Sequence, residues 1–160
     1  MQREMRRQDR NVTDSAVIAD VLNTAQVLHL GLVDDGKAYI VPLNYGWAEE
    51  NGCYTLYAHS AAEGRKVDLI ADGADVGFEM ECGIAYFDAE TACGWGNRFK
   101  SIIGEGTASL VTESEEKRTG LAAIMAHYSA RKDYTFEDAM VNLVQVIQID
   151  VTALSCKIHE

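Results

Sequence analysis

Hydrophobic residues alternate with polar or small ones along several stretches of this chain, and a period of two is the pattern of half-buried β-strands. The pattern is clearest over residues 76–82, where one face collects Val76, Phe78, Met80 and Cys82. Residues 27–33 and 38–47 are also strand-like. The turn sequence Asp34-Asp35-Gly36-Lys37 lies between them and predicts that they form an antiparallel hairpin.

Three more strands are expected at residues 53–58, 101–111 and 143–152. The first of them follows a turn at Asn51-Gly52, which makes it the second arm of another hairpin. Pro42 lies within the second arm of the first hairpin. Because proline cannot donate a hydrogen bond to a β-ladder, it places this arm at a sheet edge or predicts a bulge there.

Apolar residues at helical spacing predict three helices. The first begins after Thr13-Asp14, and its apolar stripe consists of Val17, Ile18, Val21, Leu22 and Ala25. A second is expected to start near Ala61, because Ser60 and Glu63 have the spacing of a capping box. The third follows Thr112 and carries on one face Leu121, Ile124, Met125 and Tyr128.

About six strands with short connections and three helices fit a small antiparallel barrel with helices packed outside it. Nothing marks a second boundary, so residues 1–160 are expected to form one domain. The chain has 14 Lys and Arg against 25 Asp and Glu, a formal net charge of −11. That charge argues against nonspecific binding to nucleic acid or to an anionic membrane. The N-terminal arginines have no apolar stretch behind them, so we expect neither signal peptide nor anchor, and a cytoplasmic location.

Two adjacent cations, Arg65 and Lys66, follow the junction between a strand and a helix. Free backbone N–H groups at a helix start and the positive end of the helix dipole can converge with such cations on one phosphate. Each charge-assisted hydrogen bond is typically worth ~1.5–3 kcal/mol, so two or three could hold a dianion. The alternative is a solvated basic pair on a surface helix.

Other candidate chemistry is less specific. The four cysteines are too scattered for a CxxC redox or zinc motif and are expected to be free thiols: Cys53, Cys82, Cys93 and Cys156. An acidic group lacks a histidine and tight ligand spacing, so we expect a solvated face and no metal site: Glu79, Glu81, Asp88 and Glu90.

Three segments, in this order, give the chain a family resemblance: YIVPLNYG at residues 39–46, HSAAEGRK at 59–66 and SIIGEGTA at 101–108. With them the chain resembles the flavin-binding split-barrel superfamily typified by pyridoxamine 5′-phosphate oxidase, and more closely its nitroimidazole-resistance branch. The resemblance covers roughly residues 5–157. It implies a mainly β fold with α-helices, a six-stranded antiparallel split β-barrel with flanking helices, which binds FMN at the interface of a homodimer.

The resemblance also implies which residues would bind the flavin. Arg65 and Lys66 would hold the phosphate together with Ser60. The isoalloxazine would be lined by Val41, Pro42, Leu43 and Asn44. A third segment would lie near the ribityl chain or the ring: Ser101, Ile102 and Ile103. Trp95 and Phe99 flank the preceding loop, where they could cover the ring or pack in a core or dimer interface.

His59 is expected at the mouth of the flavin site, where an imidazole can donate or accept a proton near neutral pH. The resemblance implies that it is the active-site residue; the alternative is that it only packs against or hydrogen-bonds the flavin. The other histidines, His29, His127 and His159, are expected to be structural or exposed. The reaction implied is reduction of a nitro group on a small heteroaromatic by reduced FMN. Electrons could come from a nicotinamide cofactor or from a separate reductase.

Two other functions are compatible with the same sequence. A pyridoxamine 5′-phosphate oxidase proper needs extra basic residues near its C-terminus, and residues 155–160 contain no arginine. The other function is a non-enzymatic flavin or ligand binder, because a fold does not determine function.

Overall fold

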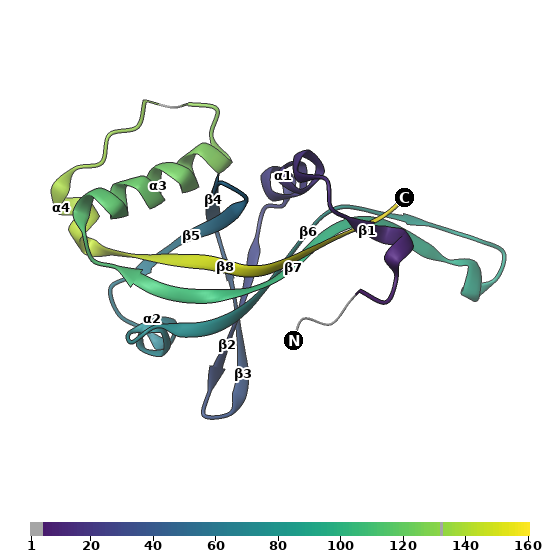
Figure 1. Ribbon diagram of the computed structural model, residues 1–160, viewed down its shortest axis with the longest axis horizontal. Helices are drawn as coiled ribbons and strands as arrows, with labels where there is room; N and C mark the ends of the chain where they lie inside the picture. Colours follow the sequence, from purple (N-terminus) through teal and green to yellow (C-terminus); the bar gives the residue numbers. More distant parts are fainter. Residues whose placement is uncertain (1–4, 132) are drawn as a thin grey trace.

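A computed structural model describes residues 5–131 and 133–160 (Figure 1). These residues form eight strands, four α-helices and two short 3₁₀-helices. In chain order the elements are η1 (Gln8–Arg10), β1 (Asn11–Val12), α1 (Ser15–Thr24), β2 (Leu28–Asp34), β3 (Lys37–Leu43), β4 (Tyr45–Glu50), β5 (Cys53–Ala61), α2 (Arg65–Ile70), β6 (Ala74–Phe87), η2 (Ala92–Gly94), β7 (Gly96–Val111), α3 (Ser114–Tyr128), α4 (Asp138–Leu143) and β8 (Val144–His159).

The strands form one antiparallel sheet in the order β3-β2-β6-β7-β8-β5-β4, with β1 paired to β8. Figure 1 shows the three long strands, β6, β7 and β8, running beside one another. Helix α3 packs on β4 and β5, α1 packs on β6 and β7, and α2 contacts β2 and β7. Among the described strands β3 and β4 do not pair, so the sheet stays open. The mainly β fold with antiparallel strands and flanking helices is therefore confirmed.

The expected count of six strands is not confirmed. The segment predicted as one strand over residues 38–47 is divided at Asn44 into β3 and β4, which lie at opposite ends of the sheet. A further short strand, β1, pairs with the C-terminal strand. Pro42 lies in the edge strand β3 opposite His29, with no register shift, so the edge explanation for this proline holds and the bulge does not.

The three helices that the sequence predicts all form, but only the first has the predicted cap. The Asp14 carboxylate accepts a hydrogen bond from the backbone N–H of Ala16 at 2.8 Å, so this residue caps α1 as expected. The capping box and the helix start near Ala61 are wrong, because β5 continues through that residue. Gly64 is the N-cap of α2, with a φ of 136°. Likewise α3 follows Glu113, so Thr112 is not its cap.

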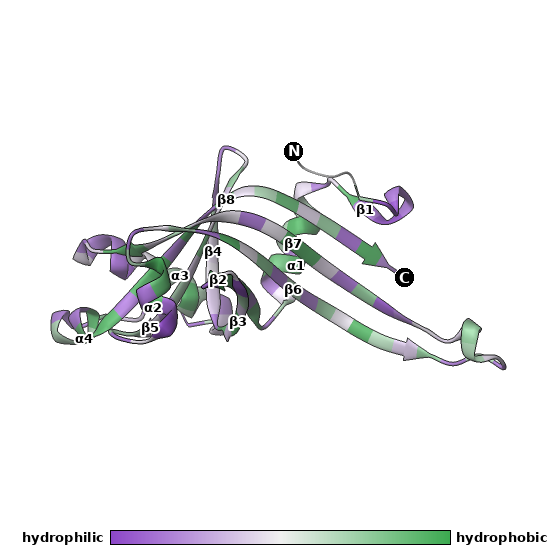
Figure 2. Ribbon diagram, turned by 90° about the horizontal axis from the view of Figure 1, so that it is seen from below, coloured by the Kyte–Doolittle hydropathy of each residue, from purple (hydrophilic) through white to green (hydrophobic). Residues whose placement is uncertain are grey.

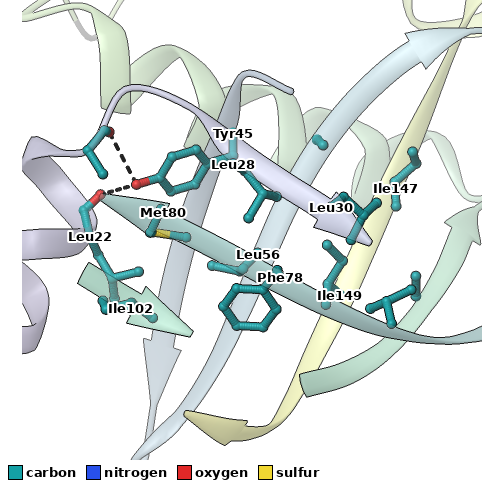
Figure 3. Packing of buried hydrophobic residues seen from close by; sticks show 14 of the residues in the cluster. Leu22, Leu28, Leu30, Tyr45, Leu56, Phe78, Met80, Ile102, Ile147 and Ile149 are labelled. Atoms are coloured by element: carbon teal, nitrogen blue, oxygen red, sulfur yellow. Dashed lines mark hydrogen bonds between the residues drawn. The ribbon is translucent and has the colours of Figure 1, made fainter. Parts of the chain in front are cut away.

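The hydrophobic core lies between α1 and the inner face of the sheet. Tyr45 is its largest fully buried side chain, and its hydroxyl donates to the Leu22 carbonyl at 2.7 Å and reaches the Ala25 carbonyl at 3.2 Å (Figure 3). These bonds occupy backbone oxygens at the C-terminal end of α1 that have no intrahelical partner. The strand alternation predicted over residues 76–82 is confirmed, and Figure 2 shows it as alternating bands along β6 and β7. In the described part of the chain, no helix is both long and apolar enough to span a membrane.

Candidate functional site

One row of side chains crosses four strands on the outer face of the sheet. In an antiparallel sheet, residues that pair directly project from the same face. Pro42 of β3 pairs with His29 of β2, His29 pairs with Glu79 of β6, and Glu79 pairs with Ile103 of β7. We call these four residues the cross-strand row. Pro42, predicted to line the isoalloxazine, and Ile103, predicted to lie near the ribityl chain or the ring, therefore lie on either side of a histidine and a glutamate.

Not every residue predicted to contact the flavin projects from this face. Ile102 is fully buried in the core, and Val41 and Leu43 pack against the core from β3. The period of two along a strand accounts for this division, because neighbours in a run point to opposite faces. Ser101 projects on the same side as Ile103, while Asn44 is exposed at the break between β3 and β4.

Among the described residues, no strand pairs with the outer edge of β3, which leaves one row of its backbone groups free. Strand β3 pairs with β2 along one side, and it is the first strand in the sheet order. Every second residue of an edge strand turns its N–H and C=O away from the ladder, where they can bind a ligand. The segment predicted to line the isoalloxazine thus lies where its backbone is accessible.

Arg65 and Lys66 are the first two residues of α2. The Arg65 side chain is held in place, because its Nε and Nη2 both lie 2.6 Å from the Asp34 carboxylate and its guanidinium lies 4.2 Å from the centre of the Tyr39 ring. Its Nη1 makes no hydrogen bond to Asp34. Lys66 is half-buried and forms no ion pair with any described residue. Ser60 is buried, and its hydroxyl donates to the Ala61 carbonyl at 2.9 Å.

His59 lies apart from the cross-strand row in the sheet. It is exposed on β5 opposite Val146 of β8, and both β7 and β8 lie between β5 and β6. Within the described residues, no hydrogen bond or ion pair joins His59 to Arg65, Lys66 or His29. The location of His59 beside the flavin therefore stays a prediction.

The structure brings together a group that the sequence did not predict. The Nδ1 atom of His29 lies 3.2 Å from an Oε atom of Glu79, and Glu81 projects beside them from the same strand. Burial and, next, the neighbouring Glu81 carboxylate raise the pKa of Glu79 from its usual 4.5 to about 7. His29, which was expected to be structural or exposed, has a side chain that is 38% exposed and contacts Glu79. The spacing of two residues between Glu79 and Glu81 predicts that both project from the same face of a strand. That His29 lies beside them depends on the register of β2 against β6, which the sequence does not reveal.

The remaining candidates lie outside this group. Asp88 and Glu90 follow the end of β6 and are exposed. Trp95 is also exposed, whereas Phe99 packs edge-on against His159 with ring centres 5.8 Å apart. All four cysteines are free thiols, as expected. His127 is structural, because its Nε2 bonds to the Ala25 carbonyl and its ring packs on Tyr45.

A family model described as pyridoxamine 5′-phosphate oxidase matches residues 14–158. A search of curated proteins found no match.

Several solved structures share the fold. A candidate 5-nitroimidazole antibiotic resistance protein from Bacteroides thetaiotaomicron is 27% identical, with 92% of this chain and 86% of that chain covered and a TM-score of 0.79. The flavocytochrome Anf3 from Azotobacter vinelandii is 17% identical, with 98% and 72% covered and a TM-score of 0.80. An FAD and heme binding protein from Mycobacterium smegmatis is 18% identical, with 94% and 74% covered and a TM-score of 0.82. The last two show likeness of fold alone.

The raised pKa of Glu79 predicts how stability depends on pH. Because the folded chain holds this proton more tightly than the unfolded chain, Glu79 contributes stability below pH 4.5 that is lost as the pH rises through about 7. Glu79→Gln should remove this loss, so the variant should gain stability relative to the wild type as the pH rises from about 5 to about 8. Urea unfolding at these two pH values measures the free energy of unfolding of both proteins. Glu105→Gln, exposed on β7, is the control, and an equal pH dependence in wild type and Glu79→Gln would contradict the assignment.

Proposed function

The chain belongs to the pyridoxamine 5′-phosphate oxidase family, and from this premise we propose that it binds FMN and uses it to reduce small nitro-aromatic compounds. One observation carries the proposal: 27% identity over 92% of this chain to a protein described as a candidate for 5-nitroimidazole antibiotic resistance. When bound, reduced FMN would supply the electrons that convert a nitro group to a nitroso group and water. The chain must then bind the cofactor, orient the substrate and deliver protons.

The cations at the start of α2 would bind the FMN phosphate. Lys66 has no carboxylate partner among the described residues, and Arg65 keeps Nη1 available while Asp34 and Tyr39 fix its guanidinium. A fixed guanidinium loses little conformational entropy when it binds an oxyanion, which favours binding. Ser60 would support the phosphate from the end of β5.

The free edge of β3 would face the isoalloxazine. Backbone groups of residues 41–44 can pair with the polar rim of a flat ring, and Pro42 projects toward the outer face of the sheet. Ser101 and Ile103 of β7 would approach the ribityl chain or the ring from that face, with Ile102 holding the strand in the core. The alternation of β7 therefore lets one segment serve both the core and the ligand.

A homodimer would cover the outer face. Large apolar side chains remain exposed on the β2–β3 hairpin and on the long strands: Ile40, Ile84, Tyr86 and Ile103. Large exposed apolar groups favour a protein interface, and a second copy would also enclose a flavin that one open sheet leaves uncovered.

The first experiment records the absorbance spectrum of the purified protein before and after FMN is added. Dithionite then reduces the flavin under anaerobic conditions, and a 5-nitroimidazole is added to the reduced protein. We expect flavin bands that bleach and return once the nitro compound is reduced. Bound flavin that bleaches but is not reoxidised would indicate a flavin binder without this activity, and the absence of flavin binding would overturn the proposal.

Arg65→Ala combined with Lys66→Ala should weaken FMN binding strongly. Two lost charge-assisted hydrogen bonds, at ~1.5 kcal/mol or more each, correspond to an affinity about 100-fold lower. Fluorescence quenching of FMN measures the dissociation constant. Arg131→Ala, which removes an exposed cation paired with Asp133, is the matched control. If the double variant retains wild-type affinity, the phosphate binds elsewhere.

His59→Ala should keep its flavin yet reduce the nitro compound more slowly, by about 100-fold if this imidazole donates the proton. The rate of flavin reoxidation by a 5-nitroimidazole, followed by stopped flow across pH, measures this effect. His59→Gln keeps a side chain that can form hydrogen bonds but cannot give up a proton near neutral pH. This variant therefore separates proton donation from hydrogen bonding. Full activity in His59→Gln would leave His59 with packing and hydrogen bonding only.

A further inference from the structure

Three potential metal ligands gather on the outer face of the sheet from two neighbouring strands. His29 of β2 lies directly opposite Glu79 of β6, and Glu81 follows two residues later on the same face. One ligand atom from each residue lies within 4.8 Å of the other two. The histidine comes from 50 positions earlier in the chain. The pairing of β2 with β6 therefore adds His29 to Glu79 and Glu81, of which the sequence alone shows only the two glutamates as neighbours.

The charges of this group favour a cation. In the described part of the chain, neither glutamate forms an ion pair with a lysine or an arginine, and the one ion-pair partner of Glu79 is the imidazole of His29. Two carboxylates that lie side by side repel each other, and a bound cation would remove that repulsion. The group is partly shielded from water, since the side chains of His29 and Glu79 are 38% and 36% exposed.

The distances suit a metal ion with short bonds. Zinc binds imidazole nitrogen and carboxylate oxygen at about 2.0–2.2 Å, which places neighbouring ligand atoms about 3–3.5 Å apart. The His29 Nδ1 and Glu79 Oε atoms, at 3.2 Å, already have this separation. The third ligand atom, from Glu81, lies within 4.8 Å of the other two, on a partly exposed side chain that has several rotatable bonds.

Space for the remaining coordination positions lies next to the ligands. A shallow pocket of about 470 Å³ is lined by both His29 and Glu79, and its floor includes Gly31 and Gly77, which carry no side chains. In a single copy of the chain, water or a ligand can reach a metal ion from this open side. One nitrogen and two oxygen ligands with open positions are typical of zinc, manganese or ferrous iron, whereas magnesium and calcium prefer oxygen alone.

From this geometry we propose that His29, Glu79 and Glu81 bind one divalent transition-metal ion, such as Zn²⁺ or Mn²⁺. The site lies beside the residues assigned to the flavin, but it does not depend on that assignment. The sequence-based expectation of no metal site considered only the acidic residues.

The test is isothermal titration of the full chain with ZnCl₂ and with MnCl₂, after a chelator has removed bound metal. We expect one ion per chain. Loss of a residue that only orients a ligand costs about 10- to 100-fold in metal affinity, so His29→Gln, Glu79→Gln and Glu81→Gln should each cost at least as much. Glu105→Gln removes an exposed carboxylate from β7 on the same sheet and should leave the affinity unchanged.

A second readout follows the nitrogen ligand itself. Co²⁺ bound by an imidazole and two carboxylates should give a visible absorption band that is absent in His29→Gln, and circular dichroism shows that each variant is folded. Equal Zn²⁺ affinity in all four variants would overturn the proposal. So would Mg²⁺ or Ca²⁺ competing as well as Zn²⁺, because that result indicates carboxylate binding alone.

Discussion

The pairing of β2 with β6 is the constraint on which both the core and the site depend. It consists of three residue pairs, His29 with Glu79, Leu30 with Phe78 and Gly31 with Gly77. The middle pair is buried and the outer two pairs face away from the core. Because side chains alternate along a strand, a slip of β2 by one residue against β6 would expose Leu30 and bury His29. The apolar pair therefore fixes the geometry of the polar one.

Features of the fold that depend on neighbouring residues could be predicted from the sequence. The Asp14 cap of α1 and the turn at Asn51-Gly52 each rest on a few adjacent residues, and both form as expected. Ser60 and Glu63 show the limit of this reasoning, because their spacing is that of a helix cap. Pairing of β5 with β8 extends the strand through Ala61 instead, and a propensity of a few residues cannot outweigh a ladder of that length.

Features of the site that depend on distant residues could not be predicted. The contact between His29 and Glu79 joins two strands whose register is set by the packing of the whole core, and a single sequence does not reveal it. The same holds for Arg65, whose position depends on Asp34 and Tyr39 of a hairpin. By contrast, the division of residues 41–44 and 101–103 between core and outer face follows from the period of two alone.

The edge strand β3 carries the only proline of the chain. An edge strand with unpaired backbone groups is a template for another β-strand, and native proteins often prevent such pairing with a proline. Pro42 lacks an N–H, so an added strand would find an interrupted ladder. A small molecule needs only one or two of the remaining groups. The edge of β3 is thus protected against intermolecular β-sheet growth and aggregation while it stays open to compact ligands.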